Sequence, residues 1–218
     1  MDSIRLRIEG FPLAVLVEAA LGIGALALAW MFRVPLREQL PADGRALALA
    51  IARGTLATLP MLAAFLWLMR SAHPELVQLR EQVQEMVEVL FPTGKLAQLA
   101  LVAALAGVGE ELLFRGVLQP LAIRWTTPAI GLVVASLLFG LAHSLSRVYF
   151  FFALAVGLYL GGLAMHYHDL LAPMIAHGLY DFLALAYFCK FAAAPQPAEP
   201  TTPQTDAEST EIHEPPSD

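Results

Sequence analysis

The chain has 218 residues, of which 58% are hydrophobic and only 15% carry a charge, and this balance excludes a water-soluble domain of ordinary composition. Its formal net charge of -6 does not indicate a cationic partner, because residues 195–218 hold six of the 19 acids and no Lys or Arg. No basic surface for nucleic acid is evident, and the single cysteine, Cys189, excludes an internal disulfide bond. The composition therefore predicts an integral membrane protein.

Two long apolar runs come first in the chain, at residues 11–32 and 46–69, and each is long enough to cross a hydrocarbon core of ~30 Å as a helix. The first lacks a small-residue cleavage pattern near its end, so we expect a retained helix and not a cleaved signal peptide. Its only charged residue, Glu18, lies within two turns of the predicted helix start. A carboxylate there either lines a cavity or reaches the membrane interface, and we interpret Glu18 as reaching the interface.

Residues 74–91 differ from these runs because apolar residues recur there at alternating steps of three and four, with Glu, Gln and Arg between them. The apolar positions are Leu76, Leu79, Val83, Met86 and Leu90. This spacing predicts an amphipathic helix and not a membrane span. Such a helix lies on the membrane surface, packs over the bundle or pairs with another chain, and five positions are too few to argue a coiled coil.

Four further spans are predicted, at about residues 96–120, 128–143, 148–167 and 170–191. The span at 148–167 contains Gly157, Gly161 and Gly162, and small residues four apart are typical of a close-packing face between helices. The fold class is therefore all-α, a polytopic transmembrane helix bundle of about six spans plus one amphipathic surface helix.

Three parts of the chain are expected to form separate units. Residues 1–94 hold two spans and the amphipathic helix, residues 95–191 form a four-span catalytic core, and residues 192–218 are a disordered, acidic, Pro-rich tail. Lys and Arg are more frequent in the loops on the side of the two termini, which favours both termini in the cytoplasm. The Ala- and Leu-rich composition suits a bacterial inner membrane.

A stretch at the end of the predicted third span carries three charged side chains, Glu110, Glu111 and Arg115. Ionisable residues at bilayer depth are costly unless they are paired or line a wet cavity, so they indicate a functional site. Glu111 and Arg115 are four residues apart and share one helix face, which predicts an ion pair. Glu110 points about 100° away from Glu111 and is left to face something else.

The last spans add two histidines, His143 and His177, and a carboxylate, Asp181, four residues after His177 on the same helix face. We expect Glu110, His143 and His177 to converge in the core of the bundle. Their chemistry suits activation of water, either by a glutamate acting as general base or by a zinc ion held by Glu110, His143 and His177. The cofactor is accordingly either none or one zinc ion. The predicted helix limits do not obviously bring the three groups to one level in the membrane.

These residues resemble the motifs of the CAAX-protease and bacteriocin-processing family of intramembrane proteases, also called the Abi family or the type II CAAX prenyl endopeptidases. The resemblance covers roughly residues 95–190 and rests on three motifs in the family's order. These motifs are Glu110-Glu111-x-x-x-Arg115, Phe139-x-x-x-His143 and His177-x-x-x-Asp181.

The resemblance implies an all-helical membrane peptidase in which Glu110 and His143 activate the attacking water and Glu111 and Arg115 form a supporting pair. It further implies that His177 and residue 181 stabilise the oxyanion or complete the site. Position 181 is often asparagine in the family and is aspartate here. Because an ionised aspartate cannot donate a hydrogen bond to an oxyanion, we expect Asp181 to orient His177.

The predicted function is therefore an intramembrane endopeptidase, glutamate- or zinc-dependent, that acts on a peptide precursor or a membrane-anchored protein within the lipid bilayer. The alternatives are a non-catalytic scaffold or immunity-type protein of the same fold, and a proton-coupled transporter that uses these groups as a relay. The transporter is less favoured because the six short spans show no duplicated halves.

Overall fold

The computed structural model describes residues 2–192 and, within them, the side chains of residues 10–190. The helices in chain order are α1 (Asp2–Met31), α2 (Gly44–Arg70), α3 (Pro74–Leu90), α4 (Leu96–Glu111), α5 (Gln119–Trp125), α6 (Pro128–Ala142), α7 (Arg147–Tyr167) and α8 (Leu171–Tyr187). A 3-10 turn, η1 (Leu36–Gln39), follows α1, and two π-helical segments, η2 (Leu112–Leu118) and η3 (Phe188–Ala192), follow α4 and α8. The predicted disordered tail lies outside the described residues from position 193 onward.

Within residues 2–192, five helical segments are long and apolar enough to cross a membrane, and a sixth apolar helix is shorter. The five are Gly10–Met31, Gly44–Arg70, Leu96–Trp125, Arg147–Tyr167 and Leu171–Lys190. The segment predicted as the fourth span forms α6, which has only 15 residues. Large apolar side chains such as Trp30 and Trp67 lie on the outside of the bundle, where lipid would solvate them. The all-α, polytopic bundle expected from the sequence is confirmed.

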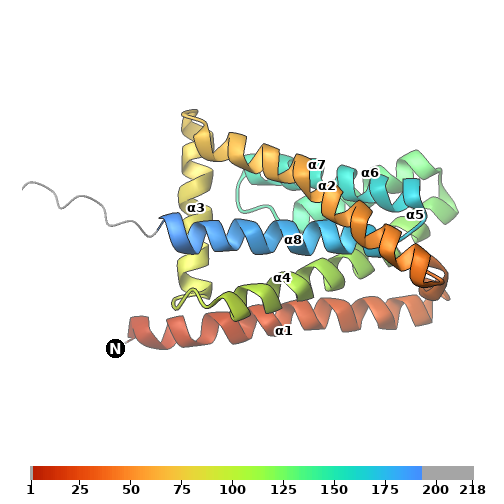
Figure 1. Ribbon diagram of the computed structural model, residues 1–218, viewed down its shortest axis with the longest axis horizontal. Coiled ribbons are helices and arrows are strands. Elements are labelled where there is room, and N and C mark those ends of the chain that lie inside the picture. Colours follow the sequence, from red (N-terminus) through yellow and green to blue (C-terminus); the bar gives the residue numbers. More distant parts are fainter. Residues whose placement is uncertain (1, 193–218) are drawn as a thin grey trace, which may run out of the picture.

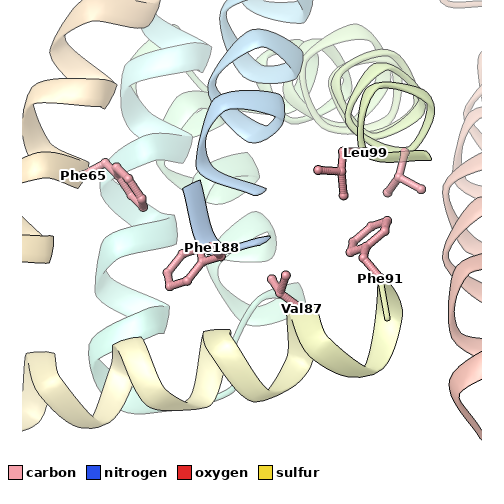
Figure 2. Close-up of a cluster of buried hydrophobic side chains, with 6 residues drawn as sticks. Phe65, Val87, Phe91, Leu99 and Phe188 are labelled. Carbon is pink, nitrogen blue, oxygen red and sulfur yellow. The ribbon is translucent and has the colours of Figure 1, made fainter. Parts of the chain in front are cut away.

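The helix α3 lies across one end of the bundle, whereas α1, α2, α4 and α8 run along its length (Figure 1). Its predicted amphipathic stripe is the contact face, because Leu79 and Val87 are almost fully buried. Figure 2 shows Val87 near Phe188, which follows α8, and Phe65 of α2 belongs to the same apolar cluster. Of the alternatives considered for this helix, packing over the bundle is the one found.

The two N-terminal spans pack directly on the predicted catalytic core. Helix α1 lies along α4, and α2 lies along α8. The division of the chain at residues 94 and 191 stays a prediction.

In the centre of the bundle, α4 packs against α8 and α6 packs against α7 so closely that their backbones are in contact. A Cβ atom added at Gly107 of α4 would lie 2.7 Å from the backbone nitrogen of Gly178 on α8. At a second crossing, a Cβ atom added at Gly157 of α7 would lie 3.1 Å from Ser136 on α6. Small residues permit such crossings in membrane bundles, where dispersion and polar contacts replace hydrophobic driving force. The close-packing role expected for Gly157 is present, whereas Gly162 faces open space.

Candidate active site

Two consecutive glutamates, Glu110 and Glu111, lie at the C-terminal end of α4, deep within the bundle. Glu111 is fully buried and Glu110 is 6% exposed. The chain continues from them into the π-helical segment η2, which contains Arg115. Because consecutive residues of a helix point about 100° apart, the two carboxylates face different neighbours.

Glu111 receives hydrogen bonds from two sides through one carboxylate oxygen, Oε1, whereas its Oε2 is buried without a partner among the described residues. Its Oε1 accepts from Arg115 Nη1 at 2.6 Å and contacts His177 Nδ1 at 2.8 Å. Arg115 Nη2 also donates to the carbonyl oxygen of Gly157 at 3.2 Å, and the guanidinium lies over the ring of Phe139, 4.3 Å from its centroid. The predicted pair of Glu111 and Arg115 is therefore one part of a larger buried network that joins α4, η2, α7 and α8.

His177 lies between two carboxylates. Its Nδ1 meets Glu111, and its Nε2 is 3.3 Å from Oδ2 of Asp181, one helical turn later on α8. A carboxylate oxygen accepts hydrogen bonds, so Nδ1 is the donor toward Glu111. The contact between His177 and Asp181 was expected from their spacing, but the one between His177 and Glu111 joins residues 66 positions apart and was not predicted.

Glu110, unlike Glu111, faces a cavity and has no Arg or Lys partner among the described residues. Its Oε2 is 3.4 Å from Nε2 of His143, and this oxygen has no hydrogen-bond partner among the described residues, although it is buried. His143 follows the last residue of α6, and its Nδ1 lies 2.9 Å from the carbonyl oxygen of Phe139. With Nδ1 donating to that carbonyl, Nε2 of a neutral imidazole is an acceptor that faces the carboxylate. Two facing acceptors are suited to share a proton or a water molecule.

A cavity of about 360 Å³ reaches these groups. Its polar lining includes Glu110, His143, His177, Asp181, Tyr149, Tyr180 and Glu18. Its apolar lining includes Phe65 of α2 and the contact face of α3, including Leu79 and Val83. The site is therefore a concave, mostly apolar chamber with convergent polar groups, the usual form of a ligand or substrate site.

The zinc set expected from the sequence, Glu110, His143 and His177, is not assembled for a metal in this structure. Both ring nitrogens of His177 face other carboxylates, so neither is directed toward the gap between Glu110 and His143. Within residues 2–192, no group of three or more His, Cys, Asp or Glu side chains is arranged to hold a metal ion. These residues therefore do not fit that ligand set as they stand.

The structure brings all six predicted site residues into one connected region. The helix limits predicted from the sequence had not placed Glu110, His143 and His177 at one level in the membrane. Glu18 takes the other of the two roles considered for it. Helix α1 extends from Asp2 to Met31, and Glu18 lies near its middle and lines the cavity. Tyr149 and Tyr180 also line the cavity and were not predicted, because a tyrosine in an apolar span carries no distinctive spacing.

Comparison with protein-family models gives a match over residues 92–183 to the family described as Type II CAAX prenyl endopeptidase Rce1-like. This segment contains Glu110, Glu111, Arg115, His143, His177 and Asp181, and it excludes Glu18. The resemblance inferred from the three motifs is therefore confirmed. Comparisons with curated proteins and with solved structures found no match.

Proposed function

We propose that this chain, a membrane protein similar to the Rce1-like type II CAAX prenyl endopeptidases, is an intramembrane endopeptidase that uses water activated by Glu110 and His143. The observation that carries the proposal is the 3.4 Å approach of Glu110 Oε2 to His143 Nε2 at the wall of a mostly apolar cavity. Neither atom has another hydrogen bond to a described residue, so both are available to one water molecule that lies beside them in the cavity.

In the proposed reaction, Glu110 accepts a proton from the water while the water oxygen attacks the carbonyl carbon of the scissile peptide bond. His143 Nε2 orients the same water. The C–N bond then breaks, and the proton held by Glu110 passes to the leaving amine, so that the hydroxyl group ends on one product and the hydrogen on the other. No metal is used in these steps.

His177 is proposed to complete the site through the charge of its ring. Its two ring nitrogens face Glu111 and Asp181, so an imidazolium donates one N–H to each carboxylate, and its positive charge stabilises a nearby oxyanion. Asp181 orients the ring from one side, and the pair of Glu111 and Arg115 fixes it from the other side.

The proposed substrate is a peptide segment of a precursor or of a membrane-anchored protein, because the apolar part of the cavity accepts hydrophobic side chains. The proposed setting is a bacterial inner membrane with both termini in the cytoplasm. In that orientation α3 and the end of the cavity that it covers lie on the cytoplasmic side.

The test is cleavage of a library of hydrophobic peptides by the full-length protein in proteoliposomes, followed by mass spectrometry. Glu110→Gln and His143→Ala are each expected to lower the rate by about 10²–10⁴-fold, the usual contribution of a general base. Glu85→Gln is the matched control, since Glu85 is exposed on α3 and does not line the cavity. Wild-type rates in either site variant would refute the proposal, and binding without any cleavage would favour the scaffold alternative.

The zinc question needs a separate measurement on the active preparation. Elemental analysis gives the number of zinc ions per chain, and this number is compared with the specific activity. Full activity at far below one zinc per chain supports the metal-free reaction, whereas activity that rises in proportion to zinc content contradicts it.

A further inference from the structure

Glu18 lies at the level of the proposed catalytic groups because α1 and α4 cross there in backbone contact. A Cβ atom added at Gly109 would lie 2.7 Å from the carbonyl oxygen of Glu18. One turn further along α1, a Cβ at Gly22 would lie 3.6 Å from the Cα of Gly109. Gly109 directly precedes Glu110, so the crossing fixes the height of Glu18 relative to the general base.

The carboxylate of Glu18 lines the same cavity as Glu110, His143 and His177. Its Oε2 is buried and has no hydrogen-bond partner among the described residues. A buried polar oxygen without a partner is costly, and it indicates a group that is satisfied only when something enters the cavity.

No Lys or Arg side chain of the described residues pairs with Glu18, and the two histidines of the cavity, His143 and His177, face other carboxylates. Among the residues that line the cavity the only Lys or Arg is Arg80, and its Nη1 is occupied by the carbonyl oxygens of Leu68, Met69 and Ser71 at the end of α2. Arg115 is bound to Glu111. No ion pair to Glu18 occurs within the side chains that the structure describes.

We propose that Glu18 is a specificity-determining residue that pairs with a basic side chain, Lys or Arg, of the substrate peptide near the scissile bond. This inference rests on the proposed peptidase function. A carboxyl group inside an apolar chamber is stabilised in its ionised form by a cationic partner and not by a neutral one, because the pair is desolvated together and mispairing leaves a buried charge. The family match excludes α1, so the residue belongs to a part of the chain outside that match.

The experiment measures peptide binding in lipid nanodiscs by fluorescence anisotropy. The probes are two fluorescein-labelled transmembrane peptides of Leu and Ala, one with a central Lys and the other with acetyl-lysine at the same place. All measurements use the Glu110→Gln background, which removes the neighbouring carboxylate charge and stops turnover under the proposed function. The variants compared in that background are Glu18→Gln, Glu18→Asp and the control Glu85→Gln.

We expect the parent to bind the Lys peptide at least about tenfold more tightly than the acetyl-lysine peptide, as for a desolvated charge pair. Glu18→Gln should abolish this preference, Glu18→Asp should keep most of it, and Glu85→Gln should leave it unchanged. Equal binding of the two peptides by the parent, or a preference that survives Glu18→Gln, would overturn the inference. This assay measures binding without cleavage. A failure of the proposed peptidase function is seen separately in the proteoliposome assay, where Glu110→Gln would form product at the wild-type rate.

Discussion

Glu110 and Glu111 are adjacent in the chain and equally deep, yet one belongs to a closed network and the other to an open one. Glu111 Oε1 meets both Arg115 and His177, and the network continues to the backbone of α7. Glu110 faces a cavity and meets His143 at 3.4 Å. An Oε2 without a hydrogen-bond partner among the described residues is common to both carboxylates, so the difference lies in the bonds of Glu111 to Arg115 and His177. The comparison teaches that a costly charge in a membrane core contributes to stability where it is paired and, under the proposed function, to chemistry where it faces the cavity.

The closed network should be the more sensitive to substitution in terms of stability. Arg115→Met leaves Glu111 buried without its cation, and we expect a loss of about 3–5 kcal/mol in the free energy of unfolding. Reversible denaturation in mixed micelles measures this loss. Arg124→Met is the matched control, since Arg124 is exposed in α5 and makes one long contact to the carbonyl of Phe32. Equal effects of the two substitutions would contradict the distinction between the networks.

The close crossing that holds the closed network together should also be sensitive. In Gly107→Ala the added methyl meets the backbone of α8 at 2.7 Å, so the helices must separate, at a cost of about 1–3 kcal/mol. Gly162→Ala adds the same methyl to open space on α7 and should be neutral or slightly stabilising. The same denaturation assay compares them. A stable Gly107→Ala protein would show that the backbone contact is dispensable.

Asp181 touches the closed network from the cavity side, and its substitution should show in rate more than in stability. Asp181→Asn keeps a polar contact to His177 but removes the charge, and charge-assisted hydrogen bonds are about twice as strong as neutral ones. We expect a roughly tenfold lower kcat for peptide cleavage. The measurement is steady-state kinetics in proteoliposomes beside Glu85→Gln. A faster variant would indicate that Asp181 restrains His177 instead of orienting it.

The open network should show the smallest effect on stability. Glu110→Gln removes a charge whose Oε2 has no hydrogen-bond partner among the described residues, so we expect a change within about 0.5 kcal/mol. The denaturation assay used for Arg115→Met applies here, and the two variants form a direct pair. A large loss of stability in Glu110→Gln would place Glu110 in the supporting framework.

Contacts within one helix could be predicted from the sequence. Residues four apart meet on a helix face, so the spacing of Glu111 with Arg115 and of His177 with Asp181 was enough to expect both contacts. The amphipathic stripe of α3 likewise predicted its buried face. These features depend on the spacing of residues within one helix, which can be read from the sequence.

Contacts between helices could not be predicted in the same way. The meeting of Glu110 with His143 depends on where α6 ends, and the meeting of Glu111 with His177 depends on the glycine crossing of α4 and α8. Glu18 was expected to reach the interface because it lies close to the start of the apolar run, and that start agrees with the apolar segment Gly10–Met31. Its place on the cavity wall depends on the crossing of α1 with α4 at Gly109, which the pattern of the first span does not contain.

The short length of α6 has a consequence for the water that hydrolysis consumes. Its 15 residues extend about 22 Å, which is less than the ~30 Å of a bilayer's hydrocarbon core. The turn that follows contains His143, Ser144 and Ser146, polar residues that lipid tails do not solvate. Local thinning of the bilayer is one way to relieve a hydrophobic mismatch of this size, and it draws headgroups and their hydration inward. Thinning at the end of α6, next to His143, would shorten the path between bulk water and Glu110 that the proposed hydrolysis needs.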